Sequence, residues 1–239
     1  MLYNVTNGII TNNSIYDNYA NSIYLDSSSD NKIINNTIQG NSYDGIDFDH
    51  FSSNILINNS IHNNSGEGID LEYSSSNTIK YNLLSNNTGW GAYINSGSND
   101  NIIYADSLYY NGGSGDTFNS LYFQAYDNGT DNCWNSSAGI GNYWYDWANN
   151  NDTNDQNHDG IVDWPYLLDG SAGAENYYPL KNNTTANILS HPLNLLAVAG
   201  NGYVNLSWKA PAYGNNTVTA YRIYRNGVLI DTVPASQLW

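Results

Sequence analysis

The chain has 239 residues and a formal net charge of −16, because Lys and Arg number 6 against 22 for Asp and Glu. Proteins that bind nucleic acids or anionic lipid surfaces need a basic patch, so this balance argues against both classes of partner. No run of 18 apolar residues occurs, and we expect no membrane insertion in this segment.

From its N-terminus the sequence repeats with a period of 23 residues. Asparagine and serine mark three columns at this interval: Asn13, Asn36, Asn59 and Asn82; Asn18, Asn41, Asn64 and Asn87; and Ser29, Ser52, Ser75 and Ser98. Apolar residues keep the same interval, as in Ile23, Ile46 and Ile69. A fixed period in this range indicates a solenoid, in which equivalent residues of successive repeats stack on one another.

Each repeat is too short for two helices and a turn, and its apolar residues alternate with polar ones. Alternation is the period of a strand with one buried face, while Asn, Ser and Gly supply the turns between strands. We therefore predict an all-β fold, a parallel β-helix over residues 1–130, with coils about 4.8 Å apart. Stacked Asn side chains should form hydrogen-bonded ladders. The period slips by one near Asn111, which follows Asn87 by 24 residues.

Acidic residues occupy outward positions of the strand that follows each Gly-Ile pair. They form three predicted columns: Asp47 and Asp70; Asp26, Asp49 and Glu72; and Asp44 and Glu67. Paired carboxylates can serve glycoside hydrolysis, which makes four residues candidate catalytic groups of a carbohydrate-active or carbohydrate-binding β-helix: Asp47, Asp49, Asp70 and Glu72. Polyuronate lyases and epimerases also need basic residues, yet the coils contain only Lys32 and Lys80. A weak divalent-cation site or a solvated acidic face is the other interpretation.

Residues 131–181 differ in composition, because Trp and Tyr gather there. We expect these rings to cap the apolar interior of the solenoid, although exposed rings would instead make a sugar-binding platform. The single cysteine, Cys133, excludes an intrachain disulfide and is expected to be a small buried residue.

A run of oxygen-bearing side chains lies inside the cap. From Asp155 to Asp163 they stand at positions one, three, five and nine, with Gly at position six. This pattern is typical of calcium loops, in which the carbonyl of position seven completes the coordination shell. We expect a structural calcium ion to be held by Asp155, Asn157, Asp159, Ile161 and Asp163. Tyr166 replaces the bidentate Glu of a full EF-hand loop, and a solvated acidic turn is the alternative.

Several short motifs of the cap carry a family resemblance. They are Ala125-Tyr126-Asp127-Asn128-Gly129, Cys133-Trp134-Asn135, Gly141-Asn142-Tyr143-Trp144, Pro165-Tyr166 and Asn176-Tyr177-Tyr178-Pro179-Leu180. Together with the repeats, over residues 8–181, they resemble the NosD-like family of right-handed parallel β-helix proteins. The resemblance implies a single-stranded right-handed β-helix and a bacterial or archaeal surface or secreted protein.

Copper, a label often given to that family, is not carried over to this chain. The candidate soft or imidazole ligands form no cluster by spacing, and they are His50, His62, His158, His191, Met1 and Cys133. Sequons such as Asn4-Val5-Thr6 fit a glycoprotein. Gly8-Ile9-Ile10 is already in phase with the coils, so we expect either that the natural protein extends further upstream or that Met1 is not its natural start.

The C-terminal part is predicted to be a separate module. Residues 182–192 read as a linker, and residues 193–239 resemble the first half of a fibronectin type III domain. Strand runs at 204–208 and 220–225, followed by the turn signal Asn226-Gly227, support that resemblance. Half a sandwich would expose an edge strand, which suggests assembly with other chains.

These observations predict an extracellular or cell-surface β-helix protein with a structural or adhesive role and no catalysis of its own. Its expected partners are other copies of itself, surface proteins or glycans.

Overall fold

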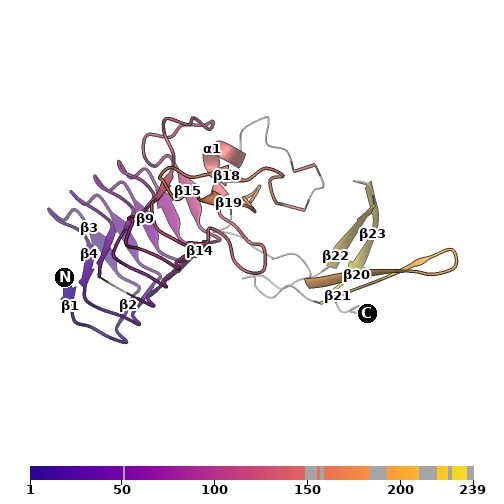
Figure 1. Cartoon of the computed structure of the whole chain (residues 1–239), viewed down its shortest axis with the longest axis horizontal. Helices are drawn as coiled ribbons and strands as arrows, with labels where there is room; N and C mark the ends of the chain where they lie inside the picture. Colours follow the sequence, from indigo (N-terminus) through magenta and orange to yellow (C-terminus); the bar gives the residue numbers. More distant parts are fainter. Residues whose placement is uncertain are drawn as a thin grey trace.

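The computed structural model describes residues 1–50, 52–148, 155–156, 159–183, 193–209, 220–225 and 228–235. The N-terminal part is a parallel β-solenoid of three sheets, with its coils stacked in succession (Figure 1). The predicted all-β solenoid class is therefore confirmed.

One strand of each coil contributes to each sheet. The first sheet contains β1 (Leu2–Tyr3), β4 (Ile23–Asp26), β7 (Ile46–Asp49), β10 (Ile69–Glu72), β13 (Ala92–Ile94) and β16 (Ala125–Asp127). The second contains β2 (Ile9–Thr11), β5 (Lys32–Ile34), β8 (Ile55–Ile57), β11 (Thr78–Lys80) and β14 (Ile102–Tyr104). The third contains β3 (Ser14–Tyr16), β6 (Thr37–Gln39), β9 (Ser60–His62), β12 (Leu83–Ser85), β15 (Ser107–Tyr109) and β17 (Tyr143–Trp144).

The interior of the solenoid is filled by like residues in register. Ile23 pairs with Ile46, and Ile46 pairs with Ile69, across successive strands of the first sheet. These side chains are buried, with Ile46 and Ile69 at 0% exposure. Each such side chain contributes about 1.5–3 kcal/mol by leaving water, so the column of isoleucines is a main source of stability.

Asparagine ladders join the turns of neighbouring coils. Asn59 shows the pattern: its Oδ1 accepts hydrogen bonds from the amide N–H and the Nδ2 of Asn36, and its Nδ2 donates to Ile33 O and Asn82 Oδ1. Each buried amide therefore satisfies backbone groups that no strand partner reaches. The predicted slip is confirmed, because Asn87 donates to Asn111 across 24 residues.

The serine column needs a correction. The amide N–H of Ser74 donates to Ser98 Oγ, whereas Ser75 Oγ accepts from Asn99, so Ser98 follows Ser74 by 24 residues and the extra residue lies before Ser98, earlier in the coil that contains Asn111. Sequence analysis also missed a further ladder, which consists of Asn31, Asn54, Asn77 and Asn101.

Aromatic side chains close the C-terminal end of the solenoid. Trp134, Trp144 and Tyr166 belong to the same core cluster as the interior isoleucines, and Trp144 stacks on Tyr166 with ring centroids 4.0 Å apart. The cap also contains α1 (Tyr145–Ala148) and the antiparallel pair β18 (Tyr166–Leu167) and β19 (Glu175–Asn176).

Not all cap residues are buried. Three of its rings are exposed, namely Trp164, Tyr177 and Tyr178. Cys133 is exposed as well, which corrects the prediction that it is a buried residue. The parallel bridge between Ile102 and Cys133 fixes the backbone there and leaves the thiol on the surface.

The C-terminal part contains two antiparallel pairs. β20 (Leu193–Ala199) pairs with β21 (Val204–Lys209), and β22 (Ala220–Arg225) pairs with β23 (Val228–Pro234). Trp208 and Tyr221 are buried and in edge contact, with ring centroids 5.3 Å apart. The fibronectin type III assignment stays a prediction, and residues 184–192 of the predicted linker lie outside the described residues. Among the described helices, none has the length and apolarity to cross a membrane.

Candidate functional site

The outer face of the first sheet gathers the acidic residues singled out by the sequence. Because side chains alternate along a strand, the residues between the buried isoleucines and leucines point outward. Register places Asp47 beside Asp70 and Asp49 beside Glu72 on the neighbouring strands β7 and β10. We call six carboxylates the acidic face: Asp44, Asp47, Asp49, Glu67, Asp70 and Glu72.

Three of these carboxylates approach closely. One oxygen each from Asp44, Glu67 and Asp70 lies within 4.8 Å of the others. Asp44 Oδ1 accepts a hydrogen bond of 2.7 Å from the amide N–H of Glu67, and Asp44 also packs against Gly66, where a Cβ would clash. Asp70 Oδ1 is buried and has no hydrogen-bond partner. The loop geometry therefore forces like charges together without a compensating group at Asp70.

Burial changes the acidity of this group. Burial and the nearby carboxylates, with Asp47 the foremost, raise the pKa of Asp70 to about 8. The pKa of Asp47 rises to about 7 through burial and the charge of Asp44, although a hydrogen bond from Asn21 opposes the rise. Burial and the hydrogen bond with Asp44 raise the pKa of Glu67 to about 7. The face can therefore hold protons near neutral pH, which exposed carboxyls do not.

The rim of the acidic face is held by neutral donors and one histidine. Asn21 Nδ2 donates to Asp47 Oδ2 at 2.5 Å, and Tyr24 Oη donates to Asp49 Oδ2 at 3.2 Å. Burial and the charge of Asp49 raise the pKa of Tyr24 to about 12. His50 Nδ1 lies 2.5 Å from Asp49 Oδ1, so Asp49 contacts two neighbouring side chains, those of Tyr24 and His50.

Aromatic rings continue the same columns beyond the acids. Tyr93 follows Asp70 in register, Tyr126 follows Tyr93, and Trp90 lies against both rings. Tyr93 and Tyr126 stack at 4.9 Å with an interplanar angle of 14°. Sequence reasoning missed this cluster, although the period already places Tyr93 at 23 residues from Asp70.

The two coil lysines lie on a different sheet from the acids. Lys32 belongs to β5 and Lys80 to β11, both of the second sheet. Lys80 Nζ lies 5.6 Å from the ring centroid of Tyr104. The acidic face therefore offers carboxylates that can bind protons, cations or hydroxyl groups, but among the described residues no lysine of the coils accompanies them, as a uronate substrate would need.

The predicted calcium loop has a compact local geometry. Asp155 accepts hydrogen bonds of 2.9 Å from the amide N–H groups of Asp159 and Gly160. Asp159 accepts from Ile161 at 2.8 Å, and Asp163 accepts from Gln156 at 2.8 Å. Asn157, the other predicted ligand, lies outside the described residues. The carboxylates thus order the turn, and calcium binding by this loop stays a prediction.

Comparison with known families agrees with this architecture. Residues 1–108 match the family model described as right handed beta helix region. Neither the curated proteins nor the solved structures contain a significant match to the chain. Fold and family match define the N-terminal part as a right-handed parallel β-helix. The match ends before the cap, so the NosD-like type stays a prediction.

Proposed function

We propose that this chain is a rigid structural or adhesive element of an extracellular or cell-surface protein and that it carries out no catalysis. One observation supports the proposal most directly: the stacked coils are joined without interruption by parallel sheets on three sides and by Asn ladders between turns. In such a solenoid each coil contacts its neighbours alone, and the product is a stiff rod with long lateral surfaces.

The surface chemistry of the chain suits this role. The excess of acidic residues keeps the rod soluble and disfavours nucleic acids and anionic lipids. The lateral faces provide room for other copies of the chain, surface proteins or glycans as partners. The sequons support an extracellular setting, in which asparagine glycosylation occurs.

A reducing-end assay on neutral and acidic polysaccharides tests the absence of catalysis. We expect no release of sugar ends by the whole chain. The competing proposal is a carbohydrate-active β-helix that uses Asp47, Asp49, Asp70 and Glu72. It is less favoured because no lysine of the coils accompanies these acids. Cleavage that is lost in both Asp47→Asn and Asp70→Asn, yet retained in Asp26→Asn, would establish that competing role.

Part of the proposal is that the loop from Asp155 to Asp163 binds a structural calcium ion. Its support is the tight turn that gathers the acidic side chains of Asp155 and Asp159. A bound cation would remove the repulsion between them and favour the folded chain by mass action.

Thermal unfolding in calcium and in EDTA tests the calcium ion. We expect a higher Tm in calcium, with the difference abolished by Asp159→Asn but retained in Asp70→Asn, which alters the acidic face. If Asp70→Asn abolished the difference and Asp159→Asn retained it, the calcium site would lie on the acidic face. An equal Tm in calcium and in EDTA would contradict a structural ion.

A further inference from the structure

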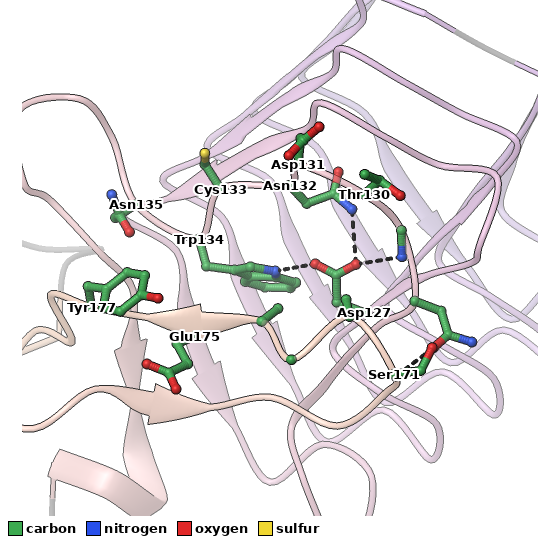
Figure 2. Close-up of a pocket in the computed structure, with 15 residues that line it drawn as sticks. Asp127, Thr130, Asp131, Asn132, Cys133, Trp134, Asn135, Ser171, Glu175 and Tyr177 are labelled. Atoms are coloured by element: carbon green, nitrogen blue, oxygen red, sulfur yellow. Dashed lines mark hydrogen bonds between the residues drawn. The ribbon is translucent and has the colours of Figure 1, made fainter.

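A polar groove lies in the cap, apart from the carboxylates of the acidic face. Its volume is about 670 Å³, and it is lined by residues 127–135 on one side and by residues 171–175 with Tyr177 on the other (Figure 2). Ligand sites for small molecules and short oligomers fall in this range of volume. Neither the calcium prediction nor the acidic face uses this groove.

The first wall is organised by one buried carboxylate. Asp127 has 0% exposure, and its Oδ2 accepts a hydrogen bond of 2.8 Å from Trp134 Nε1. Its Oδ1 accepts from the amide N–H of Gly129 and from Asn132 Nδ2, each at 2.9 Å (Figure 2). Asn132 also donates to Ser98 O, which ties this wall to the last coils of the solenoid.

The second wall is fixed to the first through direct hydrogen bonds. The amide N–H of Ser171 donates to Asn128 Oδ1 at 2.6 Å, and the hydroxyl of Ser171 donates to the same oxygen at 2.5 Å. The amide N–H of Asp127 donates to Asp169 O at 2.9 Å. Gly170, at φ 107°, packs against the backbone of Asp127, a conformation that favours glycine. Because both walls are anchored, binding here would order little additional chain.

The groove surface combines oxygen-rich side chains with an accessible ring. Asp131, Glu175 and Asn135 line it, and Tyr177, which is 61% exposed, lies with Asn135 at one end (Figure 2). Among the described residues no Lys or Arg lines the groove, so its three carboxylates, Asp127, Asp131 and Glu175, repel anions. The lining is also too polar for an apolar ligand, which would leave these groups without partners.

We propose that this groove binds a neutral saccharide. Carboxylates and amides can accept and donate hydrogen bonds to neighbouring sugar hydroxyls, and the Tyr177 ring offers an apolar face for the C–H side of a sugar. The inference goes beyond the structural role proposed above, because it assigns a ligand chemistry to a site outside the rod surface. Binding is measured separately from catalysis and calcium, so the two proposals can fail independently.

The single cysteine of the chain provides the readout. Cys133 lines the groove and is exposed, so a bound saccharide should slow its alkylation by iodoacetamide. We would measure the alkylation rate of the whole chain with neutral gluco-, manno- and galacto-oligosaccharides at up to about 10 mM, a range that detects millimolar affinity. We expect saturable protection by at least one of them, and little protection by an oligo-galacturonate of similar length.

Matched variants assign the effect to the groove. Tyr177→Ala should weaken the apparent affinity about tenfold, the loss of one aromatic contact, and Glu175→Gln should weaken it as well. Tyr178→Ala is the control, because Tyr178 is an exposed neighbouring ring outside the groove lining. Both tyrosines are on the surface, so far-ultraviolet circular dichroism should show an unchanged fold. Lack of protection by every neutral sugar, equal protection by the uronate, or an unchanged affinity in Tyr177→Ala would overturn the proposal.

Discussion

Asp106 takes the place of asparagine in one of the buried ladders. It lies 24 residues after Asn82, and its Oδ1 accepts from the amide N–H of Asn82 at 2.6 Å and from Asn82 Nδ2 at 2.8 Å. Its Oδ2 is buried without a hydrogen-bond partner. Burial raises the pKa of Asp106 to about 8, even though the hydrogen bonds from Asn82 oppose the rise. The side chain at this position of the ladder is therefore an acid, whereas a neutral amide there would form more hydrogen bonds with the backbone.

Asp106→Asn should stabilise the chain. The folded-state pKa lies above the ordinary value of 3.8, so the wild-type carboxyl favours folding fully below that value and loses its contribution as pH rises through about 8. The amide does not titrate, so stability is no longer lost as pH rises, and the amide also supplies a donor to the buried site. We expect the free energy of unfolding to rise by about 1–3 kcal/mol at pH 8. Urea unfolding at pH 5, 7 and 9 measures the gain.

The control for this substitution is Asp30→Asn, which changes an exposed acid in a turn. It should leave unfolding nearly unchanged at each pH. If Asp106→Asn were less stable than wild type at pH 9, the prediction would be wrong. That result would mean that in solution the Asp106 carboxylate has stabilising partners besides those of the buried ladder.

At the scale of the element, the carboxyl groups of the neighbouring strands β7 and β10 interact electrostatically. Asp47→Asn removes the charge that, after burial, contributes most to the raised pKa of Asp70. We expect the Asp70 carboxyl to titrate below about 8 in this variant and still above 3.8, because burial remains. ¹³C NMR titration of the Asp70 carboxyl measures the midpoint. Asp26→Asn, which changes β4, should shift it less.

The same pairing gives the acidic face a pH-dependent effect on stability. Since the folded-state pKa of Asp70 is raised, its contribution is present at low pH and is lost as pH rises toward 8. Asp47→Asn should therefore reduce the fall in urea midpoint between pH 5 and 8.5. A wild-type Asp70 that titrates near 4 would contradict the close packing of these carboxyls.

The strands could be predicted from the sequence more completely than the candidate site could. Period and alternation are properties of the local chain, so the register of Ile46 with Ile69 and the pairing of Asp47 with Asp70 could be predicted. The raised pKa of Asp70 could not, because it depends on the burial of the carboxyl and on how closely Asp44 and Glu67 approach it. The groove of the cap could not be predicted either, since Asp127 joins segments that are far apart along the chain.

For the whole molecule, the solenoid and its cap form a nearly one-dimensional assembly. Each coil is bonded to the coil before it and the coil after it, so a local loss of packing should spread weakly along the axis. The cap interrupts that series at the C-terminal end, where Trp144 is fully buried and donates from Nε1 to Asn176 Oδ1 at 2.8 Å. Loss of the Trp144 side chain should therefore destabilise the last coils most.

Trp144→Ala tests this gradient. Deleting a buried tryptophan should cost about 3–5 kcal/mol locally, because it removes apolar area and leaves a cavity. We expect amide hydrogen exchange to accelerate strongly in β15 and β16 and little in β4 and β7. Trp164→Ala is the matched control, since Trp164 is 62% exposed in the same cap and its loss opens no cavity. Equal acceleration in every coil would mean that the rod unfolds as a single cooperative unit, and the cap would then stabilise the whole solenoid rather than its last coils.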